Sequence, residues 1–410
     1  MTSPRFDKVA PVIPFPELEA EIRRFWKEEN IFHRSLAQRE HSPRFTFYEG
    51  PPTANGLPHN GHVLTRVIKD LFPRYKTMCG YYAPRKAGWD THGLPVEIEV
   101  EKQLRISGKQ AIEDYGIEPF VRLCQQSVFR YTAEWEKLTE DLGFWVDLEN
   151  AYVTYHESYV QSVWWALSEL FKKGLLYRGH KVVWWWAQGG TALSQAEVGE
   201  GYKEVDDPSI FVRFPLLEEG GGVSQDSLLV WTTTPWTLPS NSFAAVKGSI
   251  TYAEVEDPGD DEGVAAHTLI LAEELVESLA EKIGRDLTVQ RTFPGSELVG
   301  RAYQPPFDWF AQREAHDALW KIIDADFVEV SSGTGIVHIA PAYGEEDFAQ
   351  LQKLQREDAS VPLLNAVLPD GGYDPEIAPA AYAGRWVKEA DSDLSRDLKE
   401  AGLCWHLERV

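Results

Sequence analysis

Two histidines, His59 and His62, flank a short turn-forming pair just ahead of a predicted helix. Apolar residues recur at spacings of three and four between residues 63 and 72, which predicts an amphipathic helix that begins beside them. The N–H groups and the macrodipole at a helix N-terminus favour an anion, and Gly61 lets a flat ring or a phosphate come close because it has no Cβ. Both imidazoles could donate hydrogen bonds to phosphoryl oxygens while charge builds in a transition state. The spacing predicts a polyphosphate site, although two histidines in an ordinary polar loop would look the same.

Two short β-prone runs must position these groups. Residues 45–48 form the first run, and residues 49–58 after it are dense in Gly, Pro and Asn, which predicts a loop leading into the helix. The second run covers residues 82–89 and is followed by Asp90. Open α/β sheets present ligand groups at this end of their strands, so Asp90 could hold the ammonium of a free amino acid. It could equally be a residue that caps the following helix.

Hydrophobic patterning divides the chain into two parts. Residues 45–177 alternate short strands with helices, which predicts a parallel sheet with crossover helices. Helices are expected over residues 120–142 and 159–175, with their aromatic side chains in the core. Residues 205–386 instead place short β-rich runs among Gly- and Pro-rich turns, with one helical run at 271–283. This pattern predicts a separate α+β or β-barrel-like domain inserted into the first domain.

The composition limits the class of protein. A length of 410 residues predicts two or three domains. The formal net charge of −24 argues against a chain built mainly to hold nucleic acid by counterion release, although local basic surfaces could still do so. Three cysteines occur without a Cys-x-x-Cys pair, so neither a disulfide scaffold nor a thiolate metal site is expected. No apolar run approaches the roughly 18 residues of a membrane span, and the N-terminus lacks a signal peptide's apolar centre. We therefore expect a cytoplasmic protein without membrane contact.

Two sequence blocks carry a resemblance to a known family. Residues 48–62 read Tyr-Glu-Gly-Pro-Pro-Thr-Ala-Asn-Gly-Leu-Pro-His-Asn-Gly-His, and residues 88–97 read Gly-Trp-Asp-Thr-His-Gly-Leu-Pro-Val-Glu. Both blocks resemble the isoleucyl-tRNA synthetases, a family of class I aminoacyl-tRNA synthetases whose first signature is of the His-Ile-Gly-His type. Asn60 stands where that signature usually has an apolar residue, at a position the pattern leaves variable. The valyl and leucyl relatives look different at both blocks and are the close alternatives.

The resemblance implies a reaction and the residues that perform it. Isoleucine would be activated with ATP to isoleucyl-adenylate and then transferred to tRNA(Ile), with ATP used as a substrate together with Mg²⁺. The catalytic residues carried over from the first signature are His59, Asn60, Gly61 and His62. The substrate-binding residues carried over are Gly50, Pro51 and Asp90. In this family the matching aspartate, with backbone at the position of Pro51, holds the α-amino group of the substrate.

A second group of residues that could do chemistry lies in the predicted inserted domain. Hydroxyls cluster at the end of a β-prone run before a Pro turn, and an imidazole and a carboxylate follow a Gly-Thr-Gly sequence at residues 333–335. Such groups converging on one pocket could bind an aminoacyl ester and position water on it. No Ser-His-Asp relay is evident, so hydrolysis by a positioned water is favoured over a covalent route. Threonine-rich strands are also common as plain edge strands, so the residues alone leave both interpretations open.

Both stretches resemble the editing domain shared by the isoleucyl, valyl and leucyl synthetases. The residues carried over from it are Thr232, Thr233, Thr234, Asn241, His338 and Asp347. The resemblance implies that Asp347 holds the α-amino group of a mischarged residue and that His338 helps to exclude the larger, correct side chain. Editing of valyl-tRNA(Ile) is needed because one methylene contributes only roughly 1–3 kcal/mol to discrimination, a figure already established for isoleucine and valine themselves.

The resemblance implies an α/β fold, namely the first half of a class I synthetase Rossmann-type parallel sheet with an inserted β-rich (α+β) editing domain. The expected segments are an N-terminal helical extension over residues 1–44, the first half of the catalytic domain over 45–183, a connector ribbon over 184–204, the editing domain over 205–388 and a return connector over 389–410. Some members carry a Cys-x-x-Cys zinc knuckle in the connector, where this chain has Trp-Ala-Gln-Gly at residues 186–189. We therefore expect no zinc and no other metal ligand in this segment.

The resemblance covers essentially the whole chain, but the enzymes of this family are much longer. Nothing here resembles Lys-Met-Ser-Lys-Ser, the second signature that completes the ATP site. We therefore expect an N-terminal portion of such an enzyme that edits better than it activates, that lacks full aminoacylation alone, and that a separate C-terminal portion could complete. A half sheet should also leave an unpaired edge and exposed apolar surface. A freestanding editing hydrolase and a non-catalytic tRNA-binding fragment are the alternatives from other functional classes.

Overall fold

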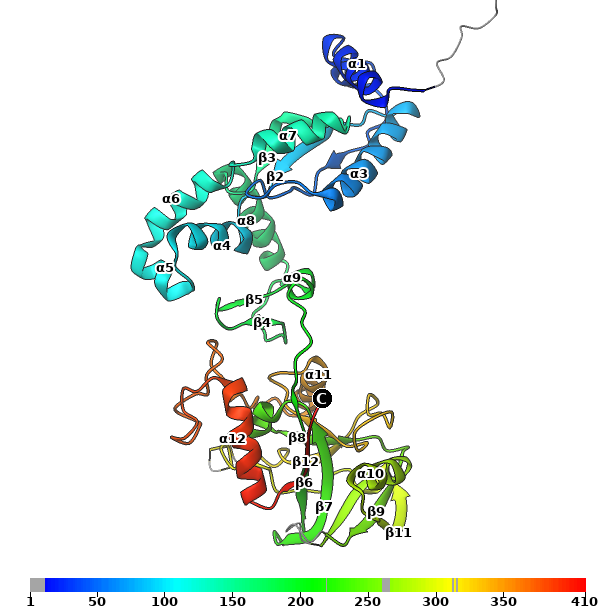
Figure 1. Ribbon diagram of the computed structural model, residues 1–410, viewed down its shortest axis with the longest axis vertical. Helices are drawn as coiled ribbons and strands as arrows, with labels where there is room; N and C mark the ends of the chain where they lie inside the picture. Colours follow the sequence, from blue (N-terminus) through cyan, green and yellow to red (C-terminus); the bar gives the residue numbers. More distant parts are fainter. Residues whose placement is uncertain (1–11, 219, 260–265, 312, 315) are drawn as a thin grey trace, which may run out of the picture. The chain divides into compact units, whose positions relative to one another are not determined.

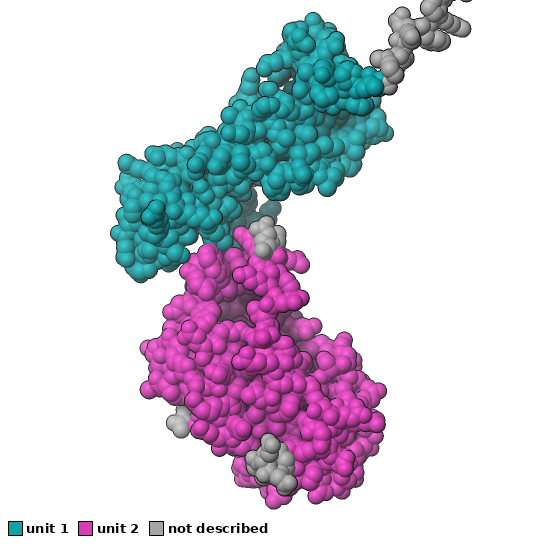
Figure 2. All heavy atoms as spheres, in the orientation of Figure 1, with its two compact units in different colours: residues 1–178 teal, residues 179–410 magenta. Residues whose placement is uncertain are grey.

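The chain forms two compact units, each with its own sheet and core (Figures 1 and 2). The computed structural model describes residues 12–218, 220–259, 266–311, 313–314 and 316–410. The first unit comprises residues 1–178 and the second comprises residues 179–410. None of the described helices is long and apolar enough to cross a membrane.

The first unit is built on a three-stranded sheet with strand order β1-β2-β3, in which both pairings are parallel. Parallel neighbours need crossover connections, which α3 supplies between β1 and β2, and α4 to α7 supply between β2 and β3. The elements are α1 (Phe15–Glu28), α2 (Ile31–Ala37), β1 (Phe47–Tyr48), α3 (Asn60–Met78), β2 (Arg85–Trp89), α4 (Leu94–Leu104), α5 (Lys109–Tyr115), α6 (Ile117–Ser127), α7 (Thr132–Asp141), β3 (Asp147–Val153) and α8 (Glu157–Lys172). The α/β class and the parallel sheet expected from the sequence are confirmed.

Trp135 is the centre of the small core of this unit. It is 1% exposed and packs with Trp89, Val153 and Ala54, which come from the two strand ends and the loop after β1. The indole N–H of Trp135 donates to the carbonyl of Gly56 at 2.8 Å. The structure divides the helix expected over residues 120–142 into α6 and α7, and of its apolar residues Val128 and Trp135 are buried whereas Val121 is 46% exposed.

The expected burial of residues 159–175 is wrong. The helix α8 forms there, but its apolar side chains are exposed, with Trp164, Trp165 and Phe171 each 68% accessible. Helix α3 shows the same feature, since Leu71 and Phe72 are about 60% exposed. An amphipathic pattern shows that one face of a helix is apolar, but it does not show which element covers that face. Both helices leave the exposed apolar surface expected of a half sheet.

A short ribbon and a helix begin the second unit. The strands β4 (Trp185–Trp186) and β5 (Thr191–Ala192) pair antiparallel, and α9 (Gln195–Glu200) follows them. The backbone of Gly189 lies against the ring of Trp186, so closely that a Cβ on Gly189 would lie 2.1 Å from a ring atom. Within the described ranges, no three or more His, Cys, Asp or Glu side chains group to hold a metal ion.

A nine-stranded mixed sheet organises the rest of the second unit. Its main path has the order β11-β9-β10-β7-β13-β8-β12, and β6 pairs with both β7 and β14. The strands are β6 (Pro208–Leu217), β7 (Val223–Thr232), β8 (Phe243–Val246), β9 (Thr251–Asp257), β10 (His267–Ala272), β11 (Thr288–Pro294), β12 (Lys321–Asp324), β13 (Val337–Ile339) and β14 (Cys404–Arg409). The helices are η1 (Pro235–Ser240), η2 (Glu273–Leu275), α10 (Val276–Ile283), η3 (Gly295–Glu297), α11 (Glu345–Glu357) and α12 (Val387–Glu400), of which the three η elements are 3₁₀-helices. A β-rich α+β domain is therefore confirmed.

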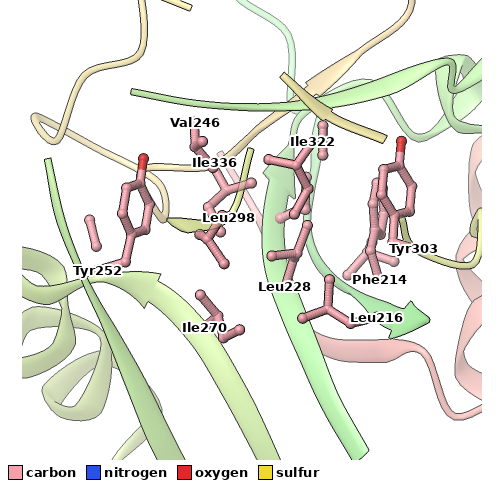
Figure 3. Close-up of a cluster of buried hydrophobic side chains, with 14 of the residues drawn as sticks. Phe214, Leu216, Leu228, Val246, Tyr252, Ile270, Leu298, Tyr303, Ile322 and Ile336 are labelled. Atoms are coloured by element: carbon pink, nitrogen blue, oxygen red, sulfur yellow. The ribbon is translucent and has the colours of Figure 1, made fainter. Parts of the chain in front are cut away.

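Both faces of this sheet are buried. Alternate residues of a strand point to opposite faces, and on β7 Leu228 and Val230 join one core, whereas Leu229 joins another. Figure 3 shows the first of these cores, where Leu228 lies among side chains that include Phe214 and Ile270. A strand that is buried on both faces reads as a continuous apolar run rather than an alternating one. Residues 389–410, expected to be a return connector, supply α12 and β14 to this unit.

Replacing Leu228 by Ala should lower the free energy of unfolding of the second unit by about 2–5 kcal/mol, because the fully buried side chain would leave a cavity. Leu407→Ala on β14 is the matched control, since Leu407 is 48% exposed and its truncation should cost less than about 1 kcal/mol. Urea unfolding followed by tryptophan fluorescence measures both losses. Equal losses in the two variants would contradict the central position of Leu228.

Candidate functional site

The two histidines form a reciprocal cap at the N-terminus of α3. His59 is the N-cap residue, and its Nδ1 accepts a hydrogen bond from the N–H of Gly61 at 3.2 Å. His62 Nδ1 accepts from the backbone N–H of His59, also at 3.2 Å. Asn60 is the first helical residue and is exposed. The four residues of the motif are thus together at the mouth of one helix.

The cap determines which ring nitrogens can meet a ligand. Because each Nδ1 accepts a hydrogen bond, each neutral ring carries its proton on Nε2. Burial, together with the neighbouring His59, Arg66 and Lys69, lowers the pKa of His62, so this ring is neutral at neutral pH. The rings lie 3.8 Å apart between centroids. Two neighbouring Nε2–H donors therefore lie where a helix N-terminus already favours an anion.

A cavity of about 280 Å³ lies beside His62, between the loop after β1 and the first turns of α3. Lys69 Nζ donates to the carbonyl of Gly50 at 2.8 Å and lies 3.6 Å from the Glu49 carboxylate. Arg66 lies 3.5 Å from the same carboxylate. Glu49 is 3% exposed, and burial raises its pKa although both cations lower it. Arg66 and Lys69 together carry two positive charges beside the single carboxylate of Glu49. The excess positive charge makes this wall of the cavity suited to a phosphate.

Asp90 and the loop at Pro51 come together at the carboxyl ends of β1 and β2. The N–H of Asp90 donates to the carbonyl of Pro52 at 2.9 Å. Gly50 and Pro51 line the cavity beside His62, whereas Asp90 lies outside its lining. The Asp90 carboxylate accepts from the N–H of His92 at 3.3 Å. Asp90 thus caps the turn before α4 while it stays at the sheet edge where a ligand would bind.

In the second unit, the three threonines, His338 and Asp347 line one cavity of about 620 Å³. The threonines lie where β7 ends and η1 begins. His338 comes beside them because β13 lies between β7 and β8 and pairs with both. Asp347 is in the first turn of α11. Two stretches about a hundred residues apart in the sequence, the threonines on one side and β13 with α11 on the other, therefore supply one set of walls.

A chain of hydroxyls links the threonines to a fourth one, Thr237 on η1. Thr232 Oγ1 accepts from the N–H of Thr234 at 3.1 Å and lies 3.1 Å from its hydroxyl. Thr237 donates to the carbonyl of Thr234 at 2.8 Å. Thr233 lines the cavity, and no described residue accepts from or donates to its hydroxyl. The Thr233 hydroxyl is therefore available to a ligand.

His338 is held in one neutral form. Its Nε2 lies 3.0 Å from Thr237 Oγ1, and its Nδ1 lies 2.8 Å from Nδ2 of Asn241. Burial lowers the pKa of His338 to about 3. With both nitrogens occupied by protein groups, this ring cannot serve as the general base of a hydrolysis. Asn241 is buried behind His338 and does not line the cavity.

Asp347 is a partly buried acid on the lining of this cavity. One carboxylate oxygen accepts from the N–H of Ala340 at 2.8 Å. Burial raises the pKa of Asp347 to about 6, against the lowering effect of that hydrogen bond. A Cβ on Gly344 would lie 2.8 Å from the carboxyl carbon, so the backbone closes one side of the carboxylate. Above pH 6 the Asp347 carboxylate is therefore predominantly ionised, and together with Glu329 and Glu346 on the same lining it could hold an ammonium group.

Several residues of both cavities are absent from the set expected from the sequence. Arg66 and Lys69 are three residues apart on the helix that carries His62, and their helical spacing was a usable signal for the first site. Thr237 was recognisable only as part of the same threonine-rich stretch. Tyr343, from the loop before α11, also lines the second cavity, and burial raises its pKa to about 12. Nothing in the sequence pattern distinguishes Tyr343 from other core aromatics.

Asp347→Asn should stabilise the second unit at pH 7, and the gain should vanish near pH 4. The folded state binds the Asp347 proton more tightly than the unfolded state does, so the free energy of unfolding falls as the pH rises from about 4 to about 6. Asparagine keeps an acceptor for the Ala340 N–H and removes the buried charge. Thermal unfolding of both proteins between pH 4 and pH 8 measures the difference. A variant that is less stable than the parent at pH 7 would contradict this placement.

The family model described as tRNA synthetases class I (I, L, M and V) matches residues 21–379. An isoleucine–tRNA ligase of Thermus thermophilus is 49% identical over 390 residues, which are 95% of this chain and 35% of that protein. One of Clostridium novyi is 45% identical over 405 residues, which are 98% of this chain and 37% of that protein.

Among solved structures, the P. knowlesi cytosolic leucyl-tRNA synthetase editing domain is 13% identical, with a TM-score of 0.38 over 51% of this chain and 98% of that one. A likeness this low carries no argument about the fold. The chain spans 35% to 37% of the length of the two isoleucine–tRNA ligases. Because the family model covers most of its residues, the chain belongs to the class I tRNA synthetases (I, L, M and V).

Proposed function

We propose that this chain is part of an isoleucine–tRNA ligase and that it carries an activation site in the first unit and an editing site in the second. The relatives with this name are 49% and 45% identical over nearly the whole chain. Isoleucine, ATP with Mg²⁺ and tRNA(Ile) would be its substrates. A separate portion of the protein would complete the ATP site. The three cysteines are all free thiols, which suits a cytoplasmic location.

In the first unit, the pair of Nε2–H donors at the mouth of α3 would bind the phosphates of ATP and stabilise charge as the adenylate forms. Lys69 and Arg66 would add positive charge along the wall of the adjoining cavity. Asp90, at the carboxyl end of β2, would hold the ammonium group of isoleucine together with the backbone near Pro51. Mg²⁺ would neutralise phosphate charge during this step.

One observation carries the proposal for the second unit: the threonines, His338 and Asp347 share the cavity of about 620 Å³. Above pH 6 the Asp347 carboxylate would bind the α-ammonium of a valyl ester. The hydroxyls of Thr232 and Thr233 would hold the ester and the attacking water. The neutral ring of His338 would form a wall and would not take a proton. Hydrolysis by positioned water fits these groups, because none of them is an activated nucleophile.

An editing site in the second unit would compensate for the limited discrimination between isoleucine and valine in the first unit. A pocket that admits isoleucine can discriminate against valine only by the roughly 1–3 kcal/mol that one methylene contributes, a figure already established for these two amino acids. A second cavity that accepts the smaller residue would hydrolyse valyl-tRNA(Ile) after it has formed. Valine and leucine specificity in the first site are the alternatives within the same family.

Replacing Asp347 by Ala should lower kcat/KM for deacylation of valyl-tRNA(Ile) by about 30-fold or more, because the charged partner of the ammonium is lost. Glu357→Ala is the matched control, an exposed acid on the same helix α11. Isoleucine-dependent pyrophosphate exchange, measured beside deacylation, tests the first unit. Deacylation with weak or no exchange is the expected result, because a separate portion would complete the ATP site, whereas robust exchange without deacylation would overturn the editing proposal.

The kcat/KM of deacylation should also rise with pH through about 6 and then level off. The reason is that the ionised form of Asp347 predominates only above its raised pKa. Initial rates between pH 5 and pH 8, corrected for spontaneous ester hydrolysis, measure this limb. A kcat/KM that instead rises with pH around pH 4 would show that an exposed acid, and not Asp347, controls the reaction.

A further inference from the structure

A chain of buried polar side chains lies behind His338, outside the cavity lining. The Tyr303 hydroxyl donates to Oδ1 of Asn241 at 2.7 Å. Asn241 Nδ2 lies 3.0 Å from the carbonyl of Phe243 and 2.8 Å from His338 Nδ1. Tyr303 is 1% exposed and Asn241 is 2% exposed. Buried groups of this kind must satisfy their hydrogen bonds within the protein.

The partners of Asn241 give its amide one orientation. The Phe243 carbonyl can only accept and so favours the NH₂ group on its side, and the Tyr303 hydroxyl stabilises the same orientation from the other side by donating to the amide oxygen. His338 Nδ1 consequently meets an N–H and carries no proton of its own. The proton of the neutral ring is therefore on Nε2, from which it is donated to Thr237 Oγ1.

Tyr303 is itself held by a strained residue. Its backbone N–H donates to the carbonyl of Trp320 at 3.0 Å, and the Trp320 indole donates to the carbonyl of Asn241 at 3.0 Å. Trp320 has a φ of +53°, in the left-handed region that bulky residues avoid. Residues in such conformations persist only where the surrounding structure holds them. Trp320 thus connects the backbones of the two residues whose side chains meet.

We propose that Tyr303 is a positioning residue, which acts through Asn241 to fix His338 as the Nε2–H tautomer and thereby to orient the hydroxyl of Thr237. Thr237 accepts from the ring, so its own proton goes to the carbonyl of Thr234. Thr237 Oγ1 can then only accept from the Thr234 hydroxyl, which lies 3.3 Å away and is 3.1 Å from Thr232 Oγ1 at the cavity wall. The effect on hydrolysis rests on the proposed editing function, whereas the effect on the ring does not.

Ring nitrogen NMR of the full chain, labelled with ¹⁵N-histidine, tests the proposal directly. The chain has 11 histidines, and the spectrum of His338→Gln identifies the signals of His338 by subtraction. The parent should show an unprotonated Nδ1 and a protonated Nε2, unchanged between pH 5 and pH 8. A parent spectrum with a protonated Nδ1 would overturn the proposal without any Tyr303 variant, so the test does not depend on a variant that folds.

Tyr303→Phe should make a second form of His338 appear, with its proton on Nδ1. The substitution leaves Asn241 Oδ1 buried without a donor, so the amide is no longer held from both sides. Tyr382→Phe is the matched control: Tyr382 is 4% exposed, and its hydroxyl donates to Asp397. This control should leave the His338 signals as in the parent. Unchanged signals in Tyr303→Phe would show that Tyr303 is only a core residue.

The kcat for deacylation of valyl-tRNA(Ile) should fall about three- to tenfold in Tyr303→Phe, with KM retained and Tyr382→Phe near the parent. An equal fall in both variants with unchanged ring signals would reflect lost stability and would overturn the proposal. Absence of deacylation in the parent would refute the proposed editing function alone. The ring spectra would then still decide the role of Tyr303.

Discussion

The pairing of β13 between β7 and β8 is the interaction on which the second cavity depends. It joins Val337 to Trp231 on one side and His338 to Ala244 on the other, across about a hundred residues of chain. Because β13 is parallel to β7 and antiparallel to β8, the imidazole arrives where β7 gives way to η1. The threonines, the ring and α11 could not share walls if β13 added to an outer edge of the sheet instead.

Burial then decides what these side chains can do. A low-dielectric site favours the neutral form of each ionisable group, so the pKa of His338 falls to about 3 and that of Asp347 rises to about 6. The two shifts separate their roles. His338 is a hydrogen-bonded part of the wall at any physiological pH, whereas Asp347 supplies a charge close to neutral pH. Asn241 and Thr237 each bind one ring nitrogen of His338, so the imidazole can be buried without an unsatisfied nitrogen.

The candidate site of the first unit is assembled by simpler means. Parallel strands present their carboxyl ends at the same edge of the sheet, so the loop after β1 and Asp90 after β2 meet there without any long-range network. Helix α3 starts at that edge, where its two histidines cap each other and keep both Nε2–H groups available. The same helix carries Arg66 one turn and Lys69 two turns after His62. The geometry of this candidate site forms although the apolar faces of α3 and α8 are exposed.

The sequence by itself determined the parallel sheet, the β-rich second unit and the helix at His59, and it supplied candidate residues for both sites, because period, turn residues and motif spacing are local properties of a chain. The sequence pattern overestimated the burial of α8, because an apolar stripe on a helix does not show which element, if any, covers it. Only the tertiary structure decided that Asn241 lies behind His338 rather than in the cavity, that Thr237 belongs to the hydroxyl chain, and that the imidazole is neutral. These facts depend on strand order and on burial, which arise from contacts between segments far apart in the chain and therefore leave no local pattern.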